Sequence, residues 1–240
     1  MDRAMVLAAG LGTRMRPLTL ERPKPLIEVG GRAMLDRVLD ALRAHGTRRA
    51  VINMHWLAEQ IAAWAARQEG RPEIRLSDER GELLETGGGI RKALPLLGEE
   101  AFFVLNADSF WLDGACPALA RLEAAWDDAA MDCLALTVPL SRAVGYAGRG
   151  DFLRDRYGRL RRAAPEAEEA AEAFTGVYVV HPRLFAEAPA EGPFSMNLLF
   201  DAAMAKGRMF GLSHDGLWLH VGTPQAIAEA ERAMAEWKAG

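Results

Sequence analysis

A glycine-rich segment near the amino end of the chain is followed by cationic side chains. Residues 7–14 have the sequence LAAGLGTR, so Gly10 and Gly12 precede Arg14, and Lys24 follows between two prolines. Small residues let backbone N–H groups come close to an anion, and arginine binds phosphate oxygens through a fork of N–H donors. The flanking prolines restrict the backbone around the lysine. The pattern therefore predicts a binding site for a polyphosphate.

Two widespread phosphate-binding motifs are absent from this segment. The P-loop pattern GxxxxGK[ST] does not occur, and the dinucleotide pattern GxGxxG fails because Met15 stands where the third glycine would be. A GxG pair alone is also typical of an ordinary turn from a strand into a helix. The cationic Arg14, Arg16 and Lys24 close by favour the phosphate site.

A second candidate feature is the run of three glycines at 87–89, which follows Glu85 and Thr86. We expect these glycines to precede a short helix over 89–97. An open backbone there could lie flat against a planar base, and it would present free N–H groups at a helix N-terminus. The alternative is a flexible helix start, because threonine and glutamate are also ordinary capping residues.

A third feature, Asn106 and Asp108, ends an apolar strand expected over 101–105. In an open α/β sheet, ligands bind outside the carboxyl ends of the strands. An aspartate in that place can hold Mg²⁺ through oxygen, and Asn106 could orient a ribose or a second substrate. A turn-forming aspartate is the alternative.

Apolar periodicity places these features on alternating elements. Buried strands are expected over 4–8, 50–54, 73–77, 101–105, 132–138 and 174–180, and helices over 33–45, 57–65, 89–97, 119–126, 195–206 and from 224 onward. A short hairpin is expected over 151–162, and an exposed loop or loose helix over 165–173. The alternation predicts an α/β fold, in which helices cover both faces of a mostly parallel mixed sheet.

Taken together, these segments resemble the signature of the sugar-1-phosphate nucleotidyltransferases, which are enzymes of the nucleotide-diphospho-sugar transferase type. The resemblance covers residues 7–19, 23–25, 85–89, 106–108, 174–177 and 221–224. It implies a Rossmann-like three-layer α/β/α fold. It also implies a reaction in which a nucleoside triphosphate and a sugar 1-phosphate give a nucleotide sugar and pyrophosphate.

The resemblance implies roles for individual residues. Arg14, Lys24 and Asp108 would be catalytic, with Arg14 on the β- and γ-phosphates and Lys24 at the reacting phosphates. The expected nucleotide contacts are Leu7, Ala8, Ala9, Gly10, Gly12, Thr13, Arg14, Lys24, Glu85, Gly87, Gly88 and Asn106. The expected contacts of the acceptor sugar are Asn106, Asp151, Thr175, Gly176 and Asn197.

The expected metal site departs from the family pattern at one position. Asp108 supplies one carboxylate, but His220 stands where compact members carry the second. Imidazole is a poor ligand for Mg²⁺, which prefers oxygen. Asp108 with substrate phosphates and water could hold Mg²⁺, or His220 could contact phosphate or favour Mn²⁺. A third alternative is a protein that binds a sugar nucleotide without catalysis.

The resemblance leaves several substrates open. In its compact size, the chain is most similar to family members that transfer a nucleotide from UTP to N-acetylmuramic acid 1-phosphate in cell-wall recycling. Mannose 1-phosphate with GTP, or glucose 1-phosphate with UTP or dTTP, are the alternatives. Arg159, Arg161 and Arg162 form a basic patch on the expected hairpin. The patch is typical of a solvated face, and a contact with the lactyl carboxylate of the acceptor is a second interpretation.

Length, composition and net charge narrow the class of protein that the sequence can encode. The chain has 240 residues and a formal net charge of −4, which argues against a general nucleic-acid-binding protein. We expect one domain over 1–240, with a nucleotide-binding half to about residue 115 and an acceptor-binding half after it. No apolar run is long enough to cross a membrane, and no signal peptide is expected. Cys116 and Cys133 are expected in the core, the protein in the cytoplasm, and the assembly as a monomer or homodimer.

Overall fold

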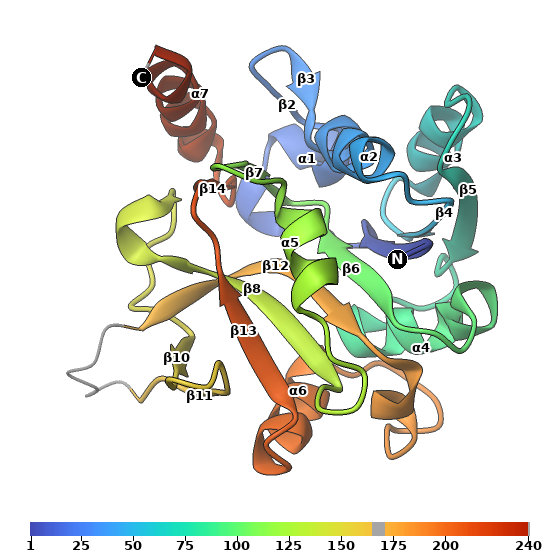
Figure 1. Ribbon diagram of the computed structural model, residues 1–240. Coiled ribbons are helices and arrows are strands. Elements are labelled where there is room, and N and C mark those ends of the chain that lie inside the picture. The colour runs from blue at the N-terminus through green and yellow to red at the C-terminus, as the bar shows by residue number, and fades with distance from the viewer. Residues whose placement is uncertain (165–170, 240) are drawn as a thin grey trace.

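The computed structural model describes residues 1–164 and 171–239, and a nine-stranded sheet forms its centre (Figure 1). The neighbours along this sheet are β5 (Glu73–Asp78), β4 (Arg49–Met54), β1 (Arg3–Leu7), β6 (Phe102–Asn106), β12 (Glu172–Val180), β8 (Cys133–Pro139) and β13 (Met209–Ser213). A hairpin of β10 (Phe152–Arg154) and β11 (Leu160–Arg162) pairs with the first residue of β12. The hairpin expected over 151–162 is thereby confirmed.

The sheet is mixed but mostly parallel, as the alternation of elements predicts. β5, β4, β1 and β6 are parallel neighbours, and β13 is parallel to β8. β12 runs antiparallel to its two long neighbours β6 and β8, and the pairings of β10 with β11 and with β12 are antiparallel as well. The parallel order brings the carboxyl ends of β1 and β6 to one edge of the sheet.

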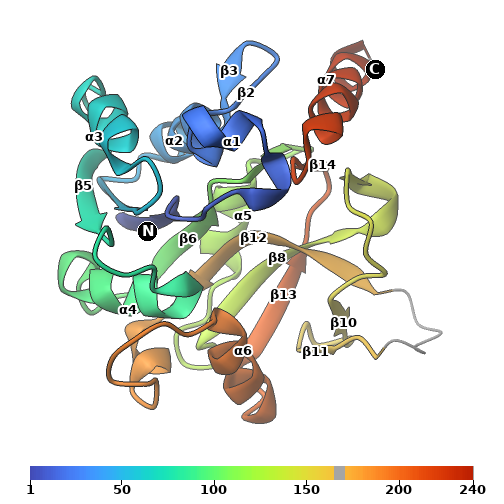
Figure 2. The same cartoon turned by 180° about the vertical axis from the view of Figure 1, so that it is seen from behind.

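Helices cover both faces of the sheet (Figures 1 and 2). α2 (Met34–His45), α3 (Ala58–Ala66) and α5 (Ala118–Ala125) pack on one face, and α4 (Glu85–Leu97) and α6 (Met196–Ala205) on the other. Alternate side chains of a strand point to opposite faces, so Val6 of β1 joins the first cluster and Met5 the second. This arrangement confirms the three-layer α/β/α architecture.

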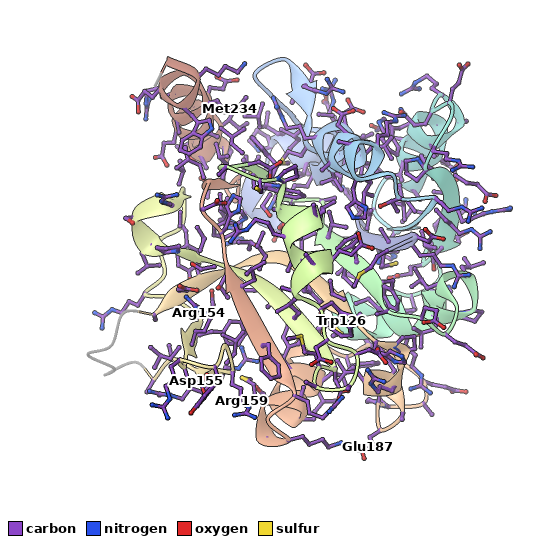
Figure 3. All side chains as sticks on the ribbon, in the orientation of Figure 1. Trp126, Arg154, Asp155, Arg159, Glu187 and Met234 are labelled. Carbon is purple, nitrogen blue, oxygen red and sulfur yellow. The ribbon has the colours of Figure 1, made fainter. Side chains whose placement is uncertain are left out.

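A smaller sheet and the last helix lie beside the main sheet. The remaining strands are β7 (Ser109–Leu112), β14 (Leu217–His220) and β9 (Ala143–Val144), which form one sheet, and the β2 (Glu28–Val29)–β3 (Arg32–Ala33) hairpin. Short α1 (Leu18–Glu21) precedes that hairpin, and α7 (Pro224–Ala239) begins at the expected proline. Met234 of α7, labelled in Figure 3, packs in a buried cluster with Val29 and Leu219. Within the described ranges, no helix combines the length and apolar composition that a bilayer crossing needs.

The helix predicted over 89–97 begins earlier than expected, at Glu85. The three glycines therefore lie inside α4, where all three are buried, rather than in front of it. A Cβ added to Gly87 would stand 2.3 Å from Cε2 of the Phe194 ring. Glycine is needed there because it lets α4 approach the segment before α6 closely. Helix propensity alone would not have placed three glycines in a helix.

Two further expectations need correction or fall outside the description. Cys133 is buried as expected, but Cys116 is exposed, so the core assignment was wrong for that residue. A loop or loose helix is expected over 165–173, and its residues 165–170 lie outside the part of the chain that the structure describes. Its last part is not a loop, because Glu172 and Ala173 open β12 and pair with β8.

Candidate active site

A cavity of about 300 Å³ opens beyond the carboxyl ends of β1 and β6. This is the edge at which open α/β sheets bind ligands. The structure gathers most of the predicted nucleotide contacts around it. The predicted residues in its lining are Leu7, Ala8, Ala9, Gly10, Gly12, Thr13, Arg14, Lys24, Glu85, Asn106 and Asp108.

The loop after β1 is stabilised by hydrogen bonds from Thr19, which in turn is bonded by Trp56. Gly12 has a φ of 61°, in the left-handed region that favours glycine. Its carbonyl accepts a 2.8 Å hydrogen bond from the buried hydroxyl of Thr19. The Thr19 carbonyl in turn accepts a 2.7 Å hydrogen bond from Nε1 of Trp56. A 3₁₀ turn over Thr13–Met15 follows Gly12, so Arg14 stands at the rim of a preformed loop.

Lys24 and Asp108 form an ion pair in the cavity wall. Lys24 Nζ lies 2.9 Å from Asp108 Oδ2, and the lysine side chain is 8% exposed against 37% for the aspartate. Burial raises the pKa of the Asp108 carboxyl, but the charge and the hydrogen bond of Lys24 outweigh it, with help from His220 and Arg14. The pKa of Asp108 therefore lies below its usual 3.8. Asp108 is an ionised carboxylate at neutral pH.

His220 ends β14 beside the same cavity. A Cβ added to Gly222, which lines the cavity, would lie 2.8 Å from His220 Nε2 and 3.7 Å from Arg14 Nη1. Burial lowers the pKa of His220, the Asp108 carboxylate does not offset this effect, and Lys24 and Arg14 lower it further. The imidazole is therefore mainly neutral at pH 7. His220 is a near neighbour of the cavity rather than part of its lining.

Asn53 is a lining residue that sequence reasoning missed. Its Oδ1 accepts a 2.7 Å hydrogen bond from the Ala8 N–H, and its Nδ2 donates one of 2.8 Å to Oε1 of buried Glu79. Glu79 Oε2 also accepts from the Leu84 N–H at 3.2 Å. The pair links the loop after β1 to the start of α4. A polar residue near the carboxyl end of β4 was the signal that could have found it.

Gly87 and Gly88 lie outside the cavity lining. Their N–H groups are not free, because both donate to the Phe194 carbonyl, at 2.8 and 3.1 Å. The expectation of unpaired donors at a helix N-terminus is therefore wrong for these two residues. Thr86, just before them, lines the cavity, and its hydroxyl accepts a 2.9 Å hydrogen bond from the Met196 N–H at the start of α6.

A second cavity of about 240 Å³ adjoins the first, and Thr86 and Asn106 line both. Asp151 and Asn197, two of the predicted acceptor contacts, also line it. Asp151 Oδ2 accepts hydrogen bonds from the Tyr146 hydroxyl at 3.0 Å and from the Phe174 N–H at 2.8 Å. This carboxylate is thus fixed in the wall, where it can accept hydrogen bonds from the hydroxyls of a sugar.

Thr175 and Gly176 line neither cavity. The Thr175 hydroxyl is buried and donates a 2.7 Å hydrogen bond to the Leu136 carbonyl. It is therefore not free to donate a hydrogen bond to the acceptor sugar. Gly176 has a φ of 78° at an irregular pairing of β12 with β8. A Cβ on it would stand 2.6 Å from Asn106 Nδ2. Gly176 therefore leaves room for Asn106 instead of presenting a side chain of its own.

Three comparisons with known proteins bear on this geometry. A family model described as Nucleotidyl transferase matches residues 3–236. The N-acetylmuramate alpha-1-phosphate uridylyltransferase of Caulobacter vibrioides is 44% identical over 236 residues, which cover 97% of both chains. The protein of that name from Neisseria meningitidis is 34% identical over 242 residues, covering 98% of this chain and 100% of its own. HddC from Yersinia pseudotuberculosis, in a crystal structure complexed with GMP-PN, shares the fold with a TM-score of 0.77 at 21% identity, covering 98% of this chain and 100% of its own.

Proposed function

This chain belongs to the nucleotidyl transferase family, and from that membership we propose that it transfers the uridylyl group of UTP to N-acetylmuramic acid 1-phosphate. The products are UDP-N-acetylmuramic acid and pyrophosphate. The observation that carries the proposal is the pair of adjoining cavities, one walled by cationic Arg14 and Lys24 and the other by Asp151 and Asn197. Similarity to two uridylyltransferases supports the choice of donor and acceptor.

The proposed reaction joins two polyanions, so it depends on positioning and on charge neutralisation. An oxygen of the acceptor phosphate forms a bond to the α-phosphorus of UTP. The bond from that phosphorus to the bridging oxygen of the β-phosphate breaks, and pyrophosphate leaves. In this proposal Arg14 neutralises the β- and γ-phosphates, and Lys24 stabilises charge at the reacting phosphates. Because Asn106 lines both cavities, we propose that it contacts both the donor and the acceptor.

Asp108 fits the role of a protein ligand to a divalent cation, because it is ionised and lies in the wall of the first cavity. In this proposal the first cavity binds the donor UTP and is called the donor cavity. Mg²⁺ is commonly held by one or two carboxylates together with substrate phosphates and water. Residues 1–164 and 171–239 contain no ready group of three or more His, Cys, Asp or Glu side chains for a metal. We therefore propose that phosphate oxygens complete the site. A bound Mg²⁺, or alternatively Mn²⁺, would supply further neutralisation of phosphate charge.

The proposal is tested by assaying purified protein with Mg²⁺ and every pairing of UTP, GTP, CTP and dTTP with several sugar phosphates. These include N-acetylmuramic acid 1-phosphate, mannose 1-phosphate and glucose 1-phosphate, and pyrophosphate release is measured. We expect the fastest release from UTP with N-acetylmuramic acid 1-phosphate. Faster release from GTP with mannose 1-phosphate would contradict the substrate and keep the reaction. Nucleotide binding by calorimetry without pyrophosphate from any pair would contradict catalysis itself.

Replacing His220 by aspartate tests whether this position faces the metal. A carboxylate adds a second oxygen ligand beside Asp108, so the Mg²⁺ concentration for half-maximal rate should fall about 3- to 10-fold. His181→Asp is the matched control, because His181 caps a short turn after β12, at the end of that strand remote from the cavities. An unchanged Mg²⁺ requirement in His220→Asp would leave His220 a packing role against Trp218, whose ring centroid lies 5.3 Å away.

A further inference from the structure

The second cavity, which lies beside the first, is called the acceptor cavity here because the proposed function places the acceptor sugar in it. Among the residues that the structure describes, its lining contains a single cationic side chain. That side chain is Arg162, the last residue of β11. The hairpin that carries it stands at the periphery of the molecule, where Figure 3 labels Arg154, Asp155 and Arg159. Because Asp151 lies in the same wall, the cavity offers one positive and one negative group to a bound sugar.

The guanidinium of Arg162 is held in place from several sides. It stacks over the Phe152 ring, with Cζ 5.0 Å from the ring centroid. Its Nε donates to Asp201 Oδ1 at 2.8 Å, and its Nη2 donates to Asn197 Oδ1 at 2.9 Å. A guanidinium has five N–H donors. The remaining donors have no partner among the described residues, so a positioned fork is available to a carboxylate.

Asp201 does not cancel this charge. Its side chain is 59% exposed, so its ion pair with Arg162 is open to solvent. Exposed ion pairs contribute little, because water screens both charges. Asn197 is neutral and fixes the orientation of the guanidinium without affecting its charge. Arg162 is itself 40% exposed, so its guanidinium is accessible to a ligand carboxylate in the cavity, beside the rings of Phe152 and Phe174 in the same lining.

We propose that Arg162 binds the lactyl carboxylate of N-acetylmuramic acid 1-phosphate and thereby sets the preference for this acceptor. The inference rests on the proposed function. With the phosphate of the acceptor toward Lys24 and the ring at Asn106 and Asp151, Arg162 is within reach of the ring substituents, because it lines the same cavity and pairs across the hairpin with Phe152, the residue after Asp151. The lactyl ether is the group that distinguishes this acceptor from N-acetylglucosamine 1-phosphate. A bidentate pair of arginine with carboxylate is the contact that recognises such a group.

The test compares both acceptors, with UTP and Mg²⁺, in wild type, Arg162→Ala and Arg162→Lys. In Arg162→Ala, kcat/KM for N-acetylmuramic acid 1-phosphate should fall about 10- to 100-fold, while kcat/KM for N-acetylglucosamine 1-phosphate stays within about twofold. Arg162→Lys should recover part of the loss, because a charge remains without the fork. Acceptor dissociation constants from calorimetry give the same comparison if turnover of the second acceptor is slow.

Arg161→Ala is the matched control, because it removes the same charge from the neighbouring residue of β11, which does not line the cavity. Its two kcat/KM values should match wild type. Equal losses with both acceptors in Arg162→Ala would overturn the proposal and make Arg162 a support of the hairpin. No loss with either acceptor would overturn it as well. A wild-type protein that uses other sugar phosphates but not N-acetylmuramic acid 1-phosphate would overturn the proposed function together with this inference.

Discussion

Replacing Lys24 by methionine is expected to lower kcat by about 10³-fold, with UTP and the preferred acceptor both saturating. The lysine ammonium is the buried cation of the donor cavity, and it is held by Asp108 at 2.9 Å. A charge that stands ready before the reaction stabilises the transition state without reorganisation. Methionine has a similar length and no charge, so it occupies the place of the lysine side chain in the cavity wall without providing that stabilisation. Pyrophosphate release under saturating conditions measures the effect.

Lys206→Met is the matched control for this prediction. Lys206 forms an exposed ion pair with Glu187 and lines neither cavity, so its loss should leave kcat unchanged. Circular dichroism on both variants checks that they remain folded. If Lys24→Met keeps kcat within about tenfold of wild type, the prediction is contradicted, and the lysine ammonium does not stabilise the transition state to the extent proposed.

Replacing Asp108 by asparagine is expected to lower kcat/KM for UTP by about 10²- to 10³-fold. The substitution keeps the shape of the side chain and a hydrogen-bond acceptor for Lys24 but removes the ionised oxygen. Because the pKa of Asp108 lies below its usual 3.8, the wild-type carboxylate stays ionised at every pH well above that value. The fold-loss should therefore be constant between about pH 6 and 9. Rates measured across that range, at several Mg²⁺ concentrations, check both points.

Asp2→Asn is the control for this substitution, since Asp2 forms an exposed ion pair with Arg48 far from the cavity lining. Higher Mg²⁺ should restore part of the rate of Asp108→Asn, because that change weakens a metal ligand, and less of the rate of Lys24→Met, because added metal does not replace the missing ammonium. A fold-loss that shrinks toward low pH would contradict the prediction. It would show that the wild-type carboxylate takes up a proton in the range tested.

Much of the fold could be predicted because its signals are local. The apolar runs at β1, β4, β6 and β8 and the stripe of α2 follow directly from the periodicity of burial. The donor cavity could also be predicted, because residues 7–14 and Lys24 are contiguous with β1. The pairing of Lys24 with Asp108 could not, since it joins residues 84 positions apart and depends on the order of strands in the sheet.

The errors arise where tertiary packing overrides a local rule. Gly87 and Gly88 suggested open backbone, but they allow α4 to contact the segment before α6 and donate to the Phe194 carbonyl. Thr175 suggested a sugar contact, but an irregularity in β12 turns its hydroxyl toward Leu136. Asn53 had no motif around it, and only its hydrogen bonds to Ala8 and Glu79 reveal its place. Each of these outcomes depends on partners that are distant in sequence.

The hydrogen bonds between α4 and the start of α6 constrain how the enzyme can be recombined with its relatives. Thr86, Gly87 and Gly88 come from one side of residue 115, and their partners Phe194 and Met196 come from the other. A chimera with its crossover near residue 115, built to exchange sugar preference, would combine the two sides of this contact from different parents. We expect such hybrids to be active only when residues 84–89 and 191–197 are inherited together.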